Sequence, residues 1–199
     1  MKQIGLAVAN YHAAHDVYPP AWTTDAAGKQ LHSWRVLILP FMEQQRLYDK
    51  IRLDEPWDSA ANSVFHDQMP QLFSFHGEYQ PGKSFTNYLA VVGPGTMWPG
   101  RDSREDSEIQ DDPSETVLVV ENRDLKVNWM QPRDHMAEEL QPEHLTTKYD
   151  APAVVMADGQ VIQLKTPIDA RLLDAALTVN GQESIDPSKL QLLPDGREH

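Results

Sequence analysis

The sequence contains no cysteine. Disulfide bonds, thiolate metal sites and thiol nucleophiles are therefore excluded together. Basic residues are also scarce, since 17 Lys and Arg stand against 30 Asp and Glu and leave a net charge of -13. A protein that binds nucleic acid through its phosphates needs clustered basic residues, so this charge excludes that class and disfavours binding to anionic membrane surfaces.

Long apolar runs are missing as well. No stretch approaches the roughly 20 apolar residues that cross a bilayer, and no apolar signal core follows Met1. We expect the chain as written to be soluble, without an export signal or a membrane anchor.

The short motifs of common catalytic sites are absent too. The ten glycines are scattered and form neither a Gly-x-Gly-x-x-Gly nor a P-loop pattern, and no Gly-x-Ser-x-Gly elbow occurs. The carboxylates between Asp102 and Asp112 lie in a charged run, which does not desolvate or position a general acid or base. We assign them to solvation, with ion binding as the alternative, and expect neither enzymatic activity nor a cofactor, a calcium ion excepted.

Length and composition favour one domain. A chain of 199 residues with 40% apolar residues is large enough to bury a core without disulfides or metals. Fifteen prolines and a mean hydropathy of -0.54 indicate many loops. We assign residues 1–181 to a single globular domain and residues 182–199 to a polar C-terminal tail.

Helical periodicity occurs in three regions. The first helix covers Gln3–Tyr11 and should end before Pro19; it begins without a capping residue, as if a longer helix had been cut. A second helical region, residues 33–53, starts at a Ser33 cap and is kinked or divided by Pro40. A third starts at Thr166-Pro167 and ends at Gly181, with one face made of Ile168, Leu172, Ala175 or Ala176, and Val179.

Strands are predicted where β-branched and apolar residues lie between turn residues, at Thr86–Val92 and Thr116–Glu121. Ala153–Ala157 and Gln160–Leu164 flank Asp158-Gly159, which predicts a β-hairpin. A type I′ turn there would need positive φ at both central residues.

The segment Gly93–Asp112 contains two Pro/Gly clusters and the charged run. It is too polar to contribute to a core, and we expect it to be mobile or held by a partner. The predicted fold is therefore α+β, with an N-terminal helix packed on a small antiparallel sheet and long loops.

Two clusters suggest metal ligands. His12 and His15 are spaced to place two imidazoles on one metal, but no third ligand is near in sequence, so an exposed or core-edge pair is the simpler interpretation. Asp54, Glu55 and Asp58 offer oxygen ligands on a turn and are candidate calcium ligands. Their spacing does not match an EF-hand loop, which favours a solvated acidic turn.

Aromatic residues could line a groove for a sugar or a peptide. We expect most of the five tryptophans to lie in the core. Trp98 is the exception, because it lies in a Pro/Gly loop. Tyr88, Trp98 and Trp129 are the candidate ligand or partner surface.

Short motifs that are typical of one family occur along the chain. The first half contains Lys2-Gln3-Ile4-Gly5-Leu6-Ala7, Asn10-Tyr11-His12, Pro19-Pro20, His32-Ser33-Trp34-Arg35-Val36-Leu37, Leu39-Pro40, Glu43-Gln44-Gln45, Leu47-Tyr48, Glu55-Pro56-Trp57-Asp58-Ser59, Thr86-Asn87-Tyr88, Val92-Gly93-Pro94-Gly95-Thr96 and Trp98-Pro99-Gly100. The second half contains Thr116-Val117-Leu118, Glu121, Asn128-Trp129-Met130, Pro132-Arg133-Asp134 and Ala157-Asp158-Gly159. With these motifs the chain resembles a large bacterial family of prepilin-like proteins of unknown function.

The resemblance implies a type IV pilin-like architecture, in which a long N-terminal helix leads into a globular α+β head. Family members usually start with a prepilin peptidase site and an apolar helix that anchors or polymerises. Met1 stands where that helix would enter the head, so either the chain was cut at this position or it is a relative that naturally lacks the anchor; we favour the cut. The full-length protein is then expected in the cell envelope or outside the cytoplasm, linked to the membrane only through the missing helix.

Two departures from the family pattern are visible. The family typically has a Cys-Pro segment before its Thr-Asn-Tyr strand, whereas this chain has Phe73-Ser74-Phe75-His76. It also carries a His ten positions before the hairpin Asp, and Lys148 occupies that place here. Any role of that cysteine or histidine is expected to be lost.

We expect a non-catalytic structural or interaction protein, the head of a pseudopilin-like subunit of the cell envelope or a secretion apparatus. Its partners would be other proteins, such as pilin-like subunits, which meet the acidic surface and the Gly93–Asp112 loop. The alternative is an extracytoplasmic binding module for small solutes such as carbohydrates, with Tyr88, Trp98 and Trp129 as stacking surfaces.

Overall fold

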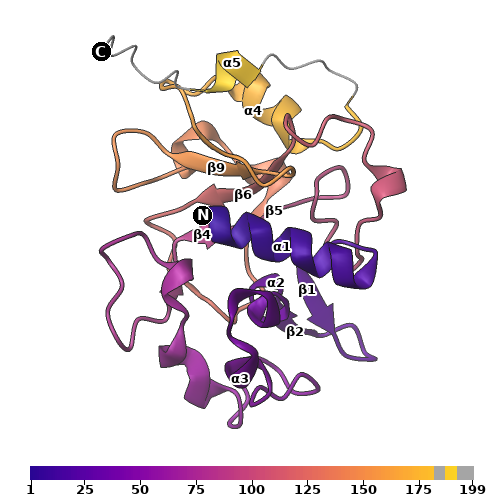
Figure 1. Ribbon diagram of the computed structural model, residues 1–199, viewed down its shortest axis with the longest axis vertical. Helices are drawn as coiled ribbons and strands as arrows, with labels where there is room; N and C mark the ends of the chain where they lie inside the picture. Colours follow the sequence, from indigo (N-terminus) through magenta and orange to yellow (C-terminus); the bar gives the residue numbers. More distant parts are fainter. Residues whose placement is uncertain (182–186, 192–199) are drawn as a thin grey trace.

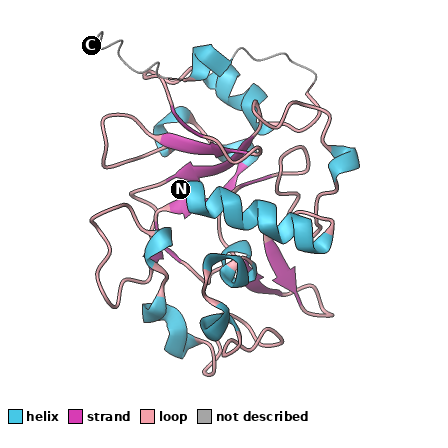
Figure 2. Cartoon of the chain, in the orientation of Figure 1, coloured by secondary structure: helices cyan, strands magenta, loops and turns pink. Residues whose placement is uncertain are grey.

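The computed structural model describes residues 1–181 and 187–191. Figure 2 shows short elements joined by long loops. The helices are α1 (Lys2–His15), α2 (Trp34–Leu37), η1 (Leu39–Met42), α3 (Gln45–Tyr48), η2 (Ser63–Gln68), η3 (Gln71–Phe73), η4 (Asp106–Glu108), η5 (Ala137–Glu139), η6 (Pro142–His144), α4 (Ala170–Leu177) and α5 (Pro187–Leu190). The strands are β1 (Trp22–Thr24), β2 (Gln30–Ser33), β3 (Phe85–Thr86), β4 (Tyr88–Leu89), β5 (Val91–Val92), β6 (Val117–Glu121), β7 (Val127–Asn128), β8 (His135–Met136), β9 (Ala153–Met156) and β10 (Val161–Gln163).

The largest sheet has four strands in the order β10-β9-β6-β4, and all neighbouring pairs are antiparallel. Successive side chains of a strand point to opposite faces. Val155 of β9 accordingly joins the hydrophobic cluster of α1, whereas Val154 and Met156 join the cluster of α4. The apolar run of β6 follows from the same arrangement, because both faces of the sheet are covered.

Figure 1 shows α1 crossing the middle of the molecule, with α4 and α5 at one end and α2 and α3 at the other. The predicted α+β fold, an N-terminal helix on a small antiparallel sheet with long loops, is confirmed. Within the described ranges, no helix has the length and apolar character that a membrane crossing requires.

α1 comes close to the β9–β10 hairpin because residue 5 is a glycine. A Cβ at this position would lie 2.7 Å from Val155 Cγ1 and 3.3 Å from Gly159 Cα. Side-chain and backbone atoms of the hairpin therefore occupy the space that any larger residue would need.

We expect Gly5→Ala to lower the free energy of unfolding by about 1–3 kcal/mol, as extra volume does in a packed site. In an open helix the same change would raise stability, because alanine is the better helix former. Urea denaturation measures the difference. Gly95→Ala is the matched control, since a Cβ there meets nothing within 4 Å. A Gly5→Ala protein as stable as the wild type would contradict this close approach.

The predicted strand Thr86–Val92 is divided into three short strands that pair with different partners. β3 pairs with β7, β4 with β6, and β5 with β8. At each break a backbone N–H leaves the ladder: Asn87 donates to Phe73 O at 2.9 Å and Ala90 to Asp134 Oδ1 at 2.8 Å. The prediction of one continuous strand was wrong because these contacts come from residues distant in sequence.

The predicted hairpin forms from β9 and β10, but its turn differs from type I′. Gly159 has φ of 84°, whereas Asp158 does not adopt positive φ. The Asp158 carboxylate accepts from the Gln160 N–H at 2.8 Å, and its own N–H donates to Pro113 O at 3.1 Å. These bonds hold Asp158 in an ordinary conformation.

The predicted helices lie at the right places in the chain, but their lengths differ from the prediction. α1 continues four residues past Tyr11 and ends where Asp16 adopts φ of 60°. Ser33 caps α2 as predicted, with its hydroxyl 3.2 Å from the Arg35 N–H. Residues 33–53 then divide into α2, η1 and α3. Pro40 is the second residue of the 3-10 helix η1, and the chain turns after Met42, where Glu43 also adopts φ of 60°.

The last predicted helix is shorter at both ends. α4 begins after Asp169, whose carboxylate caps it by accepting from the Arg171 N–H at 2.9 Å. It ends before Thr178 because the next backbone group turns away: the Val179 N–H donates to Gly95 O at 2.9 Å. Val179 is consequently buried in the cluster of α1.

The loop Gly93–Asp112 contributes to the core, contrary to the prediction. Met97 and Trp98 are each 1% exposed. The buried Arg104 guanidinium donates to Pro94 O at 2.8 Å and to Thr96 O at 2.7 Å. The prediction was wrong because the charged residues 101–112 dominate the composition of the loop, whereas the buried residues Met97 and Trp98 lie before them.

Most of the predicted polar tail, residues 182–186 and 192–199, lies outside the described residues. Between these ranges, α5 packs against the rest of the chain. Leu190 is 5% exposed, and its carbonyl accepts from the Lys165 N–H at 2.7 Å.

Candidate functional site

Arg35 and Asp134 form an ion pair in which both side chains are 0% exposed, with Nη1 and Oδ1 2.7 Å apart. Arg35 follows the Ser33 cap on α2, and Asp134 immediately precedes β8. The other hydrogen bonds of the guanidinium go to backbone carbonyls, which belong to Tyr88, Trp129, Gln131 and Arg133. A charged group can be buried when it is paired and hydrogen-bonded in this way.

Asp134 connects α2 to the junction between β4 and β5. Its Oδ1 accepts from Trp34 Nε1 at 3.2 Å and from the Ala90 N–H at 2.8 Å, in addition to Arg35. Burial raises the pKa of Asp134, and the guanidinium of Arg35 opposes that shift. The pair holds the chain before β8 in place and thereby positions His135.

Two surface hollows meet beside this ion pair. The first has a volume of about 420 Å³ and its lining includes Trp22, Asp134 and Met136. The second has a volume of about 370 Å³ and its lining includes Asn122. Three residues line both: Leu125, His135 and His144. We call the two hollows together the His135–His144 cleft.

The hydrogen bonds of the cleft fix the tautomers of both histidines. Asn122 Oδ1 accepts from the Leu125 N–H at 2.7 Å, so Nδ2 is the amide atom 3.0 Å from His135 Nε2. An amide NH₂ only donates, so His135 Nε2 must accept and the proton lies on Nδ1. The Gln141 N–H donates to His144 Nδ1 at 3.0 Å, which places the His144 proton on Nε2.

The two rings are nearly parallel, with an interplanar angle of 11° and centroids 6.2 Å apart. Each imidazole keeps one N–H that has no hydrogen-bond partner in the described part of the chain. The cleft therefore presents two donors beside the apolar surfaces of Trp22, Leu125 and Met136. Such an arrangement suits a ligand that carries carbonyl or hydroxyl oxygens.

The pKa of His135 predicts a pH effect on stability. Burial, with His144 and Arg133 nearby, lowers the pKa of His135 from 6.5 to about 4. The unfolded chain therefore binds more protons between these two values, and the free energy of unfolding falls as the pH decreases from 6.5 to 4. We expect the wild type to lose on the order of 1–3 kcal/mol more than His135→Gln over this interval.

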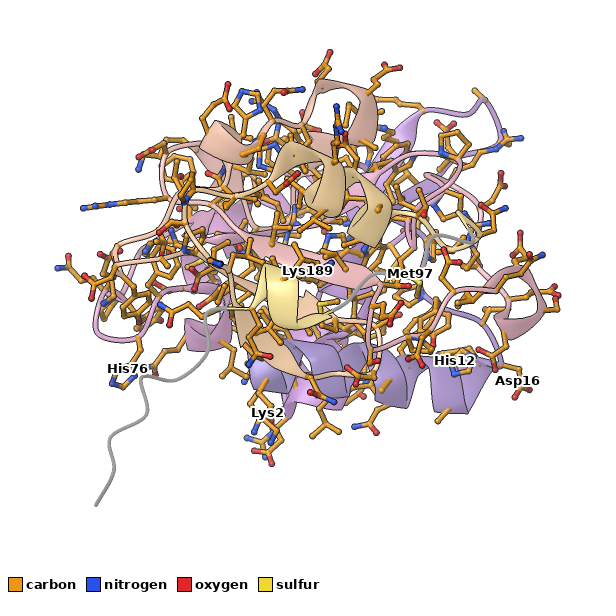
Figure 3. The ribbon with its side chains drawn as sticks, turned by 90° about the horizontal axis from the view of Figure 1, so that it is seen from above. Lys2, His12, Asp16, His76, Met97 and Lys189 are labelled. Carbon is orange, nitrogen blue, oxygen red and sulfur yellow. The ribbon has the colours of Figure 1, made fainter. Side chains whose placement is uncertain are left out.

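Urea denaturation at pH 6.5 and pH 4 measures the two losses, and carboxylates that titrate in both proteins cancel in the difference. His76→Gln is the control, because His76 is exposed (Figure 3), and it should follow the wild type. Equal losses in the wild type and His135→Gln would contradict the assignment.

The predicted aromatic surface is wrong. Trp98, Trp129 and Tyr88 are 1%, 0% and 4% exposed. The indole N–H groups of both tryptophans are bound within the protein, since Trp98 Nε1 donates to Leu118 O at 2.6 Å and Trp129 Nε1 to His66 O at 3.0 Å. All three belong to one buried hydrophobic cluster, to which Tyr88 contributes from β4 and the two tryptophans contribute from the segments after β5 and β7.

Asp54, Glu55 and Asp58 do not come together as a calcium site; the described residues contain no group of three or more potential ligands that could hold a metal ion. Glu55 instead pairs with Arg52 at 3.3 Å. The turn is organised by Asn62, which is fully buried. Its amide donates to the carbonyls of Arg52, Glu55 and Pro56.

His12 and His15 take separate partners. His12 stacks on Tyr18 and lies 3.1 Å from Asp106 Oδ1, whereas His15 contacts Tyr11. Figure 3 shows His12 and Asp16 at one end of α1, with Lys2 at the other. Lys148, in the position of the family histidine, donates to His76 O.

Sequence reasoning missed Asn122, His135 and His144. The only signal for His135 is its position directly after Pro132-Arg133-Asp134, one of the motifs that carry the family resemblance. Neither Asn122 nor His144 lies in a recognisable pattern. Their proximity depends on the pairing of β5 with β8 and on the turn after β6.

Residues 1–116 of the chain match a family described as "Protein of unknown function (DUF1559)". No curated protein and no solved structure gives a match. The matched residues end before β6, so they include Arg35 but none of Asn122, Asp134, His135 and His144.

Proposed function

The chain belongs to the family described as Protein of unknown function (DUF1559), and we propose that it is a non-catalytic interaction protein, the head of a pilin-like subunit of the cell envelope. The packing of α1 on the four-stranded sheet supports this proposal, as does the resemblance of its motifs to prepilin-like proteins. The proposed binding site is the His135–His144 cleft, and its proposed occupant is an extended segment of another protein.

The observation that carries the proposal is the pair of free N–H donors on His135 and His144, next to apolar surface. Backbone carbonyls of an extended segment would accept from these donors. Met136, which is 39% exposed, and the half-buried Trp22 and Leu125 would contact its side chains. Contiguous apolar surface that is rimmed by polar groups is typical of a protein-binding site.

The chemistry of the cleft supports binding more than catalysis. Within the described ranges, Thr146 is the one hydroxyl residue in the lining of either hollow. Its oxygen accepts from the Arg123 N–H at 2.9 Å and is not paired with either imidazole. A nucleophile needs a base within hydrogen-bond reach.

The absence of cysteine allows a direct test, because a single introduced thiol is unique. A photoreactive maleimide on Met136→Cys should give a discrete covalent adduct in an envelope fraction, and His135→Ala/His144→Ala in the same protein should abolish it. Val64→Cys is the control, since Val64 is 61% exposed on η2, outside the cleft. The same adduct from both labels, or none from Met136→Cys, would reject the proposal.

Trp22 favours carbohydrate binding as a second candidate. Its half-buried indole lines the first hollow together with the exposed polar residues Gln30, Arg133 and Glu139, a combination suited to a sugar ring. A thermal-shift screen with oligosaccharides should then raise the melting temperature of the wild type but not of Trp22→Ala. A flat response across the screen would remove this candidate.

A further inference from the structure

A third hollow, separate from the His135–His144 cleft, collects positive charge. Its volume is about 250 Å³, and its lining includes Lys83, Arg123 and Lys126. Leu125 lines both this hollow and the cleft, so the turn after β6 separates them. Three cations around one small hollow are unexpected in a chain with a net charge of -13.

These cations have no carboxylate partner among the described residues. Glu78 also lines the hollow but forms no ion pair with any of them. The ion pairs present in the described ranges are His12–Asp106, Arg35–Asp134, Arg52–Glu55, Arg101–Asp102 and Arg104–Glu108. The charge of the hollow is therefore available to a ligand.

Lys83 is held in place by neutral groups. Its ammonium donates to Ser74 Oγ at 2.7 Å and to Asn87 Oδ1 at 3.0 Å, which leaves one of its three N–H groups. Asn87 is fixed in turn, because its amide donates to Asn122 O at 3.2 Å. Burial lowers the pKa of Lys83, and Lys126 and Lys148 add to this effect while Glu78 opposes it.

The other two cations are exposed at the rim. Lys126 makes a 3.4 Å contact with Arg123 O, and the Arg123 guanidinium has no hydrogen bond or ion pair within the described part of the chain. A guanidinium matches two oxygens of a phosphate or carboxylate at once, and an ammonium adds a point charge.

We propose that this hollow binds a phosphate group. Three cations and Glu78 leave two net positive charges, which match the charge of a phosphate monoester near neutral pH. A carboxylate would neutralise only one of them. Phe85, which is 46% exposed, also lines the hollow and offers an apolar surface to an organic group attached to the phosphate.

Isothermal titration of the full chain with inorganic phosphate at low ionic strength tests the proposal, because salt screens exposed charges. We expect saturable binding, and a loss of affinity of at least tenfold in Arg123→Gln/Lys126→Gln. Both residues are exposed, so this variant should melt at the wild-type temperature. The charge-matched control Lys29→Gln/Lys50→Gln removes two exposed cations outside the hollow and should bind within twofold of the wild type.

Phenyl phosphate identifies the source of the phosphate. Tighter binding than inorganic phosphate, with the gain lost in Phe85→Ala, would support a phosphate ester, whereas equal affinity would support free phosphate. Absence of saturation with either probe, or an equal loss in the control variant, would overturn the proposal.

Discussion

Asp134→Ala should lower the free energy of unfolding by about 3–5 kcal/mol, the cost of leaving one partner of a buried ion pair alone. The carboxylate is 0% exposed and accepts from Arg35, Trp34 and Ala90. Its removal leaves the guanidinium without a counter-charge and frees the chain before β8. Urea denaturation measures the loss, and His135 should become more accessible as a consequence.

Glu55→Ala is the matched control for this prediction. It removes a carboxylate 3.3 Å from Arg52 in an ion pair whose side chains are 66% and 34% exposed. Exposed pairs of this kind contribute about 0–1 kcal/mol, so the control should remain close to the wild type. Similar losses in the two variants would show that Asp134 has no special role in stability.

Trp98→Ala should also destabilise the protein by about 3–5 kcal/mol, the usual range for a large aromatic residue in a core. The ring is 1% exposed and lies 5.0 Å from the ring of Trp34. Its N–H is bonded to Leu118 O at 2.6 Å, at the point where the pairing of β6 and β9 shifts register. The variant therefore combines a cavity with an unpaired buried carbonyl.

Two further variants separate these contributions. Trp98→Phe keeps most of the ring and removes the donor, and should cost about 1–3 kcal/mol for the carbonyl left unpaired. Tyr149→Ala removes an aromatic ring that is 47% exposed and should cost less than about 1 kcal/mol. A Trp98→Ala protein as stable as the wild type would contradict the burial of Trp98 and would favour the exposed position that the neighbouring Pro and Gly residues suggested.

Local patterns predicted the elements that depend on local interactions. α1, the Ser33 cap and the β9–β10 hairpin all follow from periodicity, a capping hydroxyl or a turn glycine. The break at Ala90 could not be predicted, because its N–H binds a carboxylate 44 positions away. The local sequence around Ala90 does not indicate that its N–H binds the Asp134 carboxylate.

The candidate site shows the same limit more strongly. Polar residues that follow one another, such as Asp54 and Glu55, were easy to notice and proved to belong to a turn. Asn122 and His135 are 13 positions apart, and no sequence pattern links their chemistry, yet they share a hydrogen bond. Composition misled in the same way for Trp98, because Pro and Gly neighbours describe the shape of a loop and not its burial.

The separation of Arg35 from Asp134 has a consequence for synthesis on the ribosome. The two residues are 99 positions apart, so the guanidinium leaves the exit tunnel long before its counter-charge is made. The residues that match the family, 1–116, contain the first charge without the second. In a nascent chain of that length, the Arg35 side chain has no counter-charge. The core around Arg35 therefore cannot form fully until Asp134 and β8 have been synthesised.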